Sequence, residues 1–187
     1  MTTIAISGTT TYPFDHKEGQ SEFRQKIERI FSRNGLAYQL LESGSIERLA
    51  PPILREALQV TDFSTGDAHL DSMLKTARAK FLDPNPLTRR ESLEKLWDAW
   101  ERLKTLDCPG DKKRSIGILL DTAASEPGLR ETLENEAREL TNIGNNFMIR
   151  HTEKGKTPID SDSHVDYLFH RMFALIHLLL KSRLVDE

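Results

Sequence analysis

The sequence has little cysteine and no long apolar run, and each shortage excludes a class of protein. Its one cysteine, Cys108, rules out an intramolecular disulfide and a cysteine-rich zinc site, which fits a reducing cytoplasm. The most apolar segment, residues 172–180, contains His177 and is far shorter than the roughly 20 residues of a membrane span. Residues 1–8 resemble no signal peptide. We therefore expect a cytoplasmic protein that is not embedded in a membrane.

A large excess of charge is also missing. The chain carries 26 basic and 29 acidic residues, a net charge of −3, so no global positive field attracts nucleic acid or an anionic membrane. Contact with RNA would have to come from a local basic patch. The 37% hydrophobic content indicates a folded chain, and 187 residues are enough for one core with a smaller appendage.

The first part of the chain predicts a small α+β unit over residues 1–62. Phe23, Ile27 and Ile30 recur at helical spacing, and Ser43-Gly44-Ser45 separates two short segments that can pair as a hairpin. Two prolines then open a short helix. In order, we expect a strand, a helix, a hairpin and a helix over residues 3–7, 21–34, 36–41 with 46–49, and 52–59.

From Asp67, a predicted helix N-cap, apolar residues recur at helical spacing in five segments joined by polar loops. Trp97 and Trp100 share one apolar stripe and are expected in the core. Burying so many single-stripe helices favours a helical bundle. The predicted fold class is therefore mostly α, with a helical bundle over residues 63–187 and helices over about 67–82, 89–106, 115–124, 129–143 and 164–184.

The motifs of common enzyme classes are absent. The sequence has no phosphate-binding G-x-x-x-x-G-K, no dinucleotide fingerprint, no H-E-x-x-H, no G-x-S-x-G and no C-x-x-C. The segment that stands out is residues 142–153, which places Asn145 and Asn146 before the adjacent pair Arg150 and His151. Arginine can stabilise phosphate charge and histidine can move protons near neutral pH, so the pair is a candidate catalytic centre.

A purely structural interpretation of that segment stays open. The asparagines would cap a helix, Arg150 would pair with Glu153, and His151 would be a surface histidine. Two further groups are candidate substrate-binding residues: His170 with Arg171, and the basic cluster Lys112-Lys113-Arg114. The cluster begins a helix, where positive charge opposes the helix dipole, so it indicates either a phosphate contact or a solvated loop. The spacing of the histidines favours no metal site.

Three blocks of sequence carry a family resemblance, and they are Arg90–Lys104, Ile143–Glu153 and Val165–Met172. In this order they resemble the C-terminal domains of bacterial abortive-infection proteins of the AbiJ-like type, which belong to the HEPN superfamily. The resemblance covers about residues 67–184. It implies a helical bundle, commonly dimeric, and in many members a metal-independent endoribonuclease of a phage-defence or toxin system.

Under this resemblance His151 moves protons at the RNA 2′-hydroxyl or the leaving oxygen, Arg150 stabilises phosphate charge, and no metal or cofactor is needed. The usual HEPN motif is an arginine, four to six intervening residues and a histidine. Before His151 those positions hold Gly144, Asn145 and Asn146, and Arg150 is adjacent instead. The alternative is therefore a non-catalytic HEPN-like binding or regulatory module, antitoxin-like or bound to a defence-system partner.

We also expect a homodimer that uses the final helix. Its apolar residues offer more surface than one side of a small bundle needs, and they are Phe169, Met172, Phe173, Ile176 and Leu180.

Overall fold

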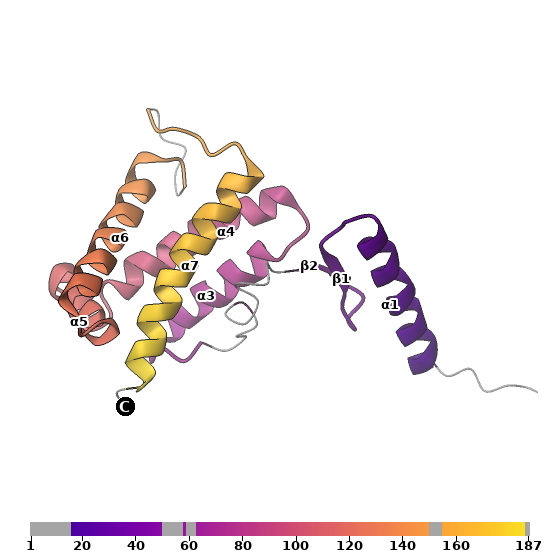
Figure 1. Ribbon diagram of the computed structural model, residues 1–187, viewed down its shortest axis with the longest axis horizontal. Helices are drawn as coiled ribbons and strands as arrows, with labels where there is room; N and C mark the ends of the chain where they lie inside the picture. Colours follow the sequence, from indigo (N-terminus) through magenta and orange to yellow (C-terminus); the bar gives the residue numbers. More distant parts are fainter. Residues whose placement is uncertain (1–15, 50–57, 59–62, 150–154, 186–187) are drawn as a thin grey trace, which may run out of the picture. The chain divides into compact units, whose positions relative to one another are not determined.

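The computed structural model describes residues 16–49, 58, 63–149 and 155–185 (Figure 1). These residues form six helices and one two-stranded sheet, which confirms the predicted mostly α fold class. The chain divides into two compact units, Met1–Ile46 and Glu47–Glu187. No helix in the described part of the chain combines the length and apolarity needed to cross a membrane.

The first unit contains α1 (His16–Arg33) and β1 (Tyr38–Leu40), and β2 (Ile46–Arg48) carries the chain into the second unit. The helix ends where Gly35 adopts a positive φ of 66°, and the ring of Phe31 packs edge-on against Tyr38 at 6.0 Å. The predicted helix and hairpin are confirmed, with the helix starting five residues earlier than residue 21. The predicted strand at residues 3–7 lies outside the described residues, as does all but Leu58 of the predicted helix at 52–59.

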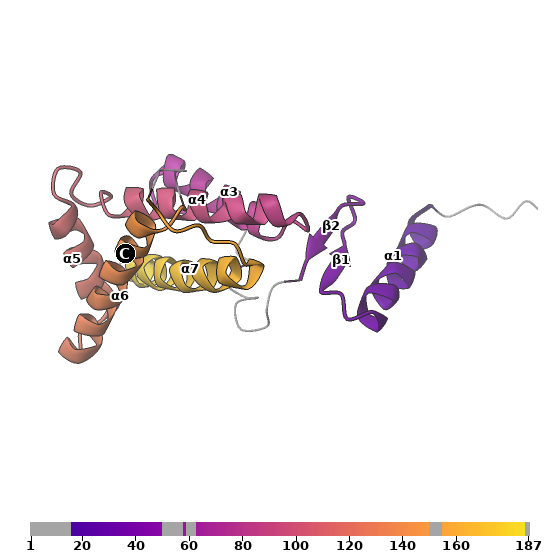
Figure 2. The same ribbon diagram turned by 90° about the horizontal axis from the view of Figure 1, so that it is seen from above.

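The second unit contains the five predicted helices, of which α7 packs on α3 and α4 while α5 and α6 lie together beside it (Figures 1 and 2). Four of them begin earlier than predicted, and the fourth is α7, which starts two residues before residue 164. In the other three, α4, α5 and α6, the residues Asn85, Asp111 and Glu126 accept hydrogen bonds from backbone amides of the first turn. The helices are α3 (Ala68–Phe81), α4 (Pro86–Leu103), α5 (Lys112–Ala123), α6 (Pro127–Asn146) and α7 (Asp162–Val185).

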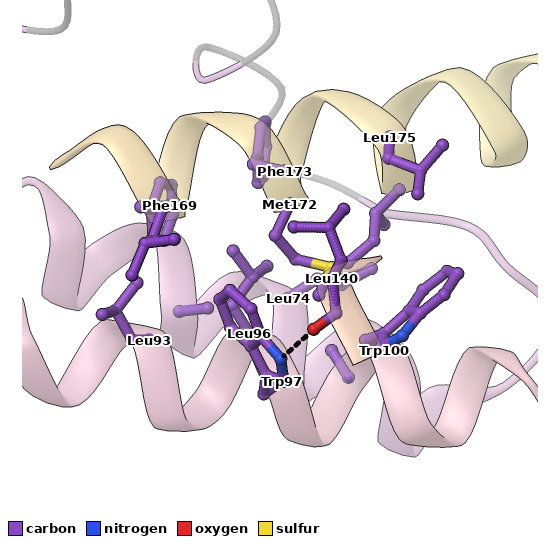
Figure 3. Close-up of a cluster of buried hydrophobic side chains, with 14 of the residues drawn as sticks. Leu74, Leu93, Leu96, Trp97, Trp100, Leu140, Phe169, Met172, Phe173 and Leu175 are labelled. Carbon is purple, nitrogen blue, oxygen red and sulfur yellow. Dashed lines mark hydrogen bonds between the residues drawn. The ribbon is translucent and has the colours of Figure 1, made fainter. Parts of the chain in front are cut away.

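All five helices from α3 to α7 contribute side chains to the core, and both tryptophans are in it (Figure 3). Trp97 is 1% exposed and its indole N–H donates to the carbonyl of Leu140 at 3.0 Å. Trp100 is also buried and donates to the hydroxyl of Thr141 at 3.1 Å. Because each buried indole has a polar partner, neither loses a hydrogen bond on folding. The predicted core positions of both tryptophans are confirmed.

The apolar residues of the final helix on which the expected dimer rests are covered within the chain itself. Phe169, Met172, Phe173 and Ile176 are at most 1% exposed, because α3, α4 and α5 of the same chain cover them. Leu180 is partly buried against the same core. These side chains are therefore unavailable to a second copy, and the described apolar residues that α7 does expose are others, chiefly Tyr167 and Leu178.

The boundary between the two units falls at residue 46, whereas the sequence placed it at residue 62. Arg48 donates its backbone N–H to the carbonyl of Leu82 at 2.8 Å, and Leu58 is 1% exposed within the helical core. Arg78 also donates from Nε to the carbonyl of Leu58. The described part of residues 47–62 thus packs as part of the helical unit.

Candidate functional site

The C-terminal end of α6 presents two of the predicted site residues. Asn145 and Asn146 are exposed there, while Gly144 is buried against Trp97. Arg150 and His151, the predicted catalytic pair, lie outside the described residues, so their contacts with the asparagines stay a prediction. A backbone hydrogen bond joins the residues on the two sides of this pair, because Met148 donates its N–H to the carbonyl of Thr157 at 2.9 Å.

Arg90 forms hydrogen bonds with both ends of the connection between α6 and α7. Its guanidinium donates to the carbonyl of Met148 at 3.1 Å and to that of Ile159. Next to this clamp lies an apolar hollow of about 290 Å³, with Phe147 from the end of α6 and Tyr167 from α7 among the residues that line it. One arginine of α4 therefore fixes both edges of the α6–α7 connection, and the hollow lies at that same edge of the bundle.

Arg171 is near this edge but is already ion-paired. Its Nε and Nη2 donate to the two carboxylate oxygens of Glu136 at 2.6 and 2.7 Å, and this raises the pKa of Arg171. Its guanidinium also lies 5.9 Å from the centre of the Tyr167 ring. A bidentate pair of this kind both orients the arginine and neutralises it. A phosphate would have to compete with Glu136 for the guanidinium.

His170, the neighbour of Arg171 in the sequence, has different surroundings. Its ring lies edge-on to Phe81 at 5.2 Å, and its buried Nε2 has no hydrogen-bond partner among the described residues. Burial, together with the charge of Arg48, lowers the pKa of His170 even though Asp166 opposes the shift. His170 thus packs against α3 while Arg171 pairs with α6. The two predicted substrate-binding residues do not form one site.

The basic cluster forms the first turn of α5, where acidic partners reduce its charge. Asp111 caps the helix by accepting from the N–H of Arg114 at 2.9 Å, and Lys112 pairs with Glu101 at 3.1 Å. Burial works against ionisation of Glu101, but hydrogen bonds from Lys104 and Lys112 leave its pKa below the ordinary value. Acidic residues of the same chain therefore offset the unfavourable interaction between this positive charge and the helix dipole. Of the three basic side chains, the exposed Lys113 and Arg114 are the better candidates for binding a phosphate.

A cluster of charges that the sequence did not reveal lies at the start of α7. Arg48 donates to both oxygens of Asp166 at 2.8 and 2.5 Å, and the buried Arg89 donates to Asp162 at 2.6 Å. Asp162, Asp166 and His170 follow one another at intervals of four residues, so they share one face of α7. This spacing is the feature of the sequence from which the cluster could have been predicted. The arginines come from α4 and from the end of β2, so only the fold brings them there. The cluster ties the start of the helical unit to α7.

A second missed feature is an arginine followed by a histidine after five intervening residues. Arg171 and His177 on α7 have this spacing, which is that of the HEPN motif, and a search of the whole chain for it would have found them. His177 stacks on Phe173 with ring centres 6.3 Å apart. Burial, and then the charge of Lys181, lowers the pKa of His177, so the imidazole is neutral at neutral pH.

Arg171 and His177 do not lie on one face of the helix. Six residues correspond to about 600° of rotation, which leaves the two side chains about 120° apart. One phosphate therefore cannot meet both groups along a single helix face.

Among the described residues, no group of three or more His, Cys, Asp and Glu side chains is placed to hold a metal ion. Comparisons with protein-family models, with curated proteins and with solved structures find no match.

Proposed function

We propose that this chain is a metal-independent endoribonuclease of the HEPN type, acting in a bacterial anti-phage or toxin system. The observation that carries the proposal is the pair Arg171 and His177 on the last helix of an all-helical bundle, with the arginine–histidine spacing of that superfamily. RNA is the substrate, because its 2′-hydroxyl supplies the nucleophile that metal-independent cleavage requires.

The lowered pKa of His177 suits it to act as a base. A neutral imidazole can take the proton of the 2′-hydroxyl while that oxygen attacks the phosphorus. The bond from phosphorus to the 5′-oxygen breaks, and the imidazolium gives its proton to this leaving oxygen, which yields a 2′,3′-cyclic phosphate and a 5′-hydroxyl. A histidine whose pKa is lowered by burial is neutral at physiological pH, as this step requires. Arg171 stabilises the charge that grows on the phosphate after the phosphate displaces Glu136. Because the two side chains diverge by about 120°, two copies of the chain supply them to one scissile phosphate.

Arg150 and His151 are a second candidate pair for the same chemistry, next to the exposed Asn145 and Asn146. The clamp by Arg90 and the hollow beside Tyr167 support a role for this edge of the bundle in holding RNA. Lys113 and Arg114 supply further phosphate contacts at the start of α5.

The test compares RNA cleavage by wild type, His177→Gln and His151→Gln in the presence of a chelator, with exposed His69→Gln as the control. Loss of a positioned base lowers the rate by about a hundredfold to ten-thousandfold, so one of the first two variants should be nearly inactive and His69→Gln should match wild type. Circular dichroism melts show whether each variant is folded. Cleavage that depends on added metal, or equal cleavage by all four proteins, would refute the mechanism.

A non-catalytic, antitoxin-like or partner-binding module is the second candidate. The ion pairs of Arg171 with Glu136 and of Lys112 with Glu101 favour it, because they occupy two of the basic groups that an RNA would need. If wild type cleaves no RNA, binding of labelled single-stranded RNA at low and high salt decides. Binding that weakens steeply with salt supports an RNA-binding module. If no RNA is bound, the remaining candidate is a module that binds a protein partner.

A further inference from the structure

α1 has an apolar stripe that its own unit leaves uncovered. Phe23 is 58% exposed and Ile30 is 52% exposed, and no side chain between residues 17 and 46 is fully buried. The two residues are seven positions apart, which places them about 20° from one another on the helix surface. One flank of the same helix, about 80° from Phe23, packs on the hairpin through Phe31 and Tyr38. Exposed clusters of large apolar side chains usually mark an interface.

The charges beside this stripe are arranged in two halves. Glu18 and Glu22 lie in the first half of α1, and Arg29 and Arg33 lie in the second half. At about 100° per residue, all four fall on the same flank of the stripe, roughly 80° to 140° from Phe23. Lys26 lies on the same flank, about 60° from Phe23, and pairs with Glu22 of its own chain at 3.8 Å. This flank of the helix is thus acidic at its start and basic from residue 26 onward.

We infer that α1 docks against α1 of a second copy of this chain, with the two helices antiparallel. A two-fold axis between residues 26 and 27 places Phe23 of one copy opposite Ile30 of the other. In an antiparallel pair the same flanks meet, so Glu22 lies within about one helical turn of Arg29 of the second copy, and Glu18 within about one turn of Arg33. The two Lys26 side chains lie nearest the axis, and each is paired with Glu22 of its own chain. The acidic half of one helix therefore lies against the basic half of the other, which is why a second copy is the occupant.

The residues of this interface are separate from those of the proposed ribonuclease site, although that site also requires two copies of the chain. The interface lies in the first unit, whereas the candidate catalytic residues lie in the second. Cleavage assays test the one, and self-association tests the other.

Charge-reversal variants of the full chain test the inference by sedimentation equilibrium. Glu22→Arg and Arg29→Glu each place like charges together twice at the two-fold interface, so each should raise the dimer dissociation constant by about tenfold or more. An equimolar mixture of the two variants restores both attractive pairs and should restore dimerisation. Glu28→Arg makes the same charge change as Glu22→Arg on the opposite flank, and should leave the dissociation constant unchanged.

Replacing both apolar residues, Phe23→Ser with Ile30→Ser, should leave the chain monomeric. Three results would overturn the inference: a monomeric wild type at high micromolar concentration, no rescue in the mixture, or an unchanged dimer in the double serine variant. The last of these would mean that copies meet through another surface. Because rescue requires two variants that are each folded, recovery in the mixture also excludes misfolding as the cause of the single-variant effects.

Discussion

Gly144 lies where α6 crosses the ring of Trp97, with no room for a side chain. A Cβ at this position would be 2.3 Å from both Cδ1 and Nε1 of the indole, and the ring is fixed by its hydrogen bond to Leu140. We expect Gly144→Ala to destabilise the protein by about 1–3 kcal/mol, measured by urea unfolding. Gly110→Ala is the control, because nothing lies within 4 Å of a Cβ there. Equal stability of the two variants would mean that the contact with Trp97 is loose.

His170 makes stability depend on pH. Burial and Arg48 lower its pKa from the ordinary 6.5, so the unfolded chain binds the proton more readily than the folded chain does. The stabilisation is complete above pH 6.5 and decreases as the pH falls through 6.5 towards the folded pKa, by up to about 1.4 kcal/mol for each unit of depression. His177 acts in the same direction. The free energy of unfolding should therefore be lower at pH 5.5 than at pH 7.5.

The variant His170→Gln should reduce this difference between the two pH values, leaving the contribution of His177. Asp67, whose pKa is lowered to about 2 chiefly by its hydrogen bond from Arg102, changes charge only below this range and does not contribute. An identical difference in the variant would show that His170 is protonated equally well in the folded and unfolded chain.

At the scale of elements, one carboxylate connects two helices. Asp67 accepts from the N–H groups of His69 and Leu70 at the start of α3, and also from Arg102 near the end of α4. Asp67→Asn keeps a good N-cap and loses the ion pair, whereas Asp67→Ala loses both. We expect the thermal midpoint to fall in the order wild type, Asn, Ala, with about 0.5–2 kcal/mol for the loss of the cap. If Asn and Ala are equally destabilised, the cap contributes nothing.

The elements were predictable from the sequence because their signals are local. Helical spacing identified all five helices of the second unit, and the errors, of up to three residues, are at helix starts and helix ends. At the start of α4, for example, Asn85 caps the helix and Pro86 is its first residue. The all-round apolar character of α7 was correctly seen, but the sequence alone does not show which partners cover it. It is the chain's own α3, α4 and α5 that do so.

The candidate site was less predictable because its contacts are distant in sequence. Arg171 meets Glu136, 35 residues away, and Arg48 meets Asp166, 118 residues away. No local spacing relates such pairs, so the sequence could nominate Arg171 and His170 but could not show that they point to different helices. Arg171 and His177 were within reach of a sequence argument, because their spacing is local.

The whole molecule has one described core, and that core lies in the second unit. The buried apolar side chains all come from Leu58 onward, and Arg48 binds Asp166 of α7. We therefore expect a fragment of residues 47–187 to unfold cooperatively, with a urea midpoint close to that of the full chain. A fragment of residues 63–187, cut at the boundary that the sequence indicated, loses both contacts.

The shorter fragment should be less stable by about 2–5 kcal/mol or more, because removing Leu58 leaves an unfilled space in the core and removing Arg48 leaves Asp166 with only the distant Arg89, at 3.7 Å. Leu58→Ala and Arg48→Ala in the 47–187 fragment separate the two contributions. If the fragment of 63–187 is as stable as that of 47–187, then residues 47–62 do not belong to the helical unit, and its core is complete from α3 onward.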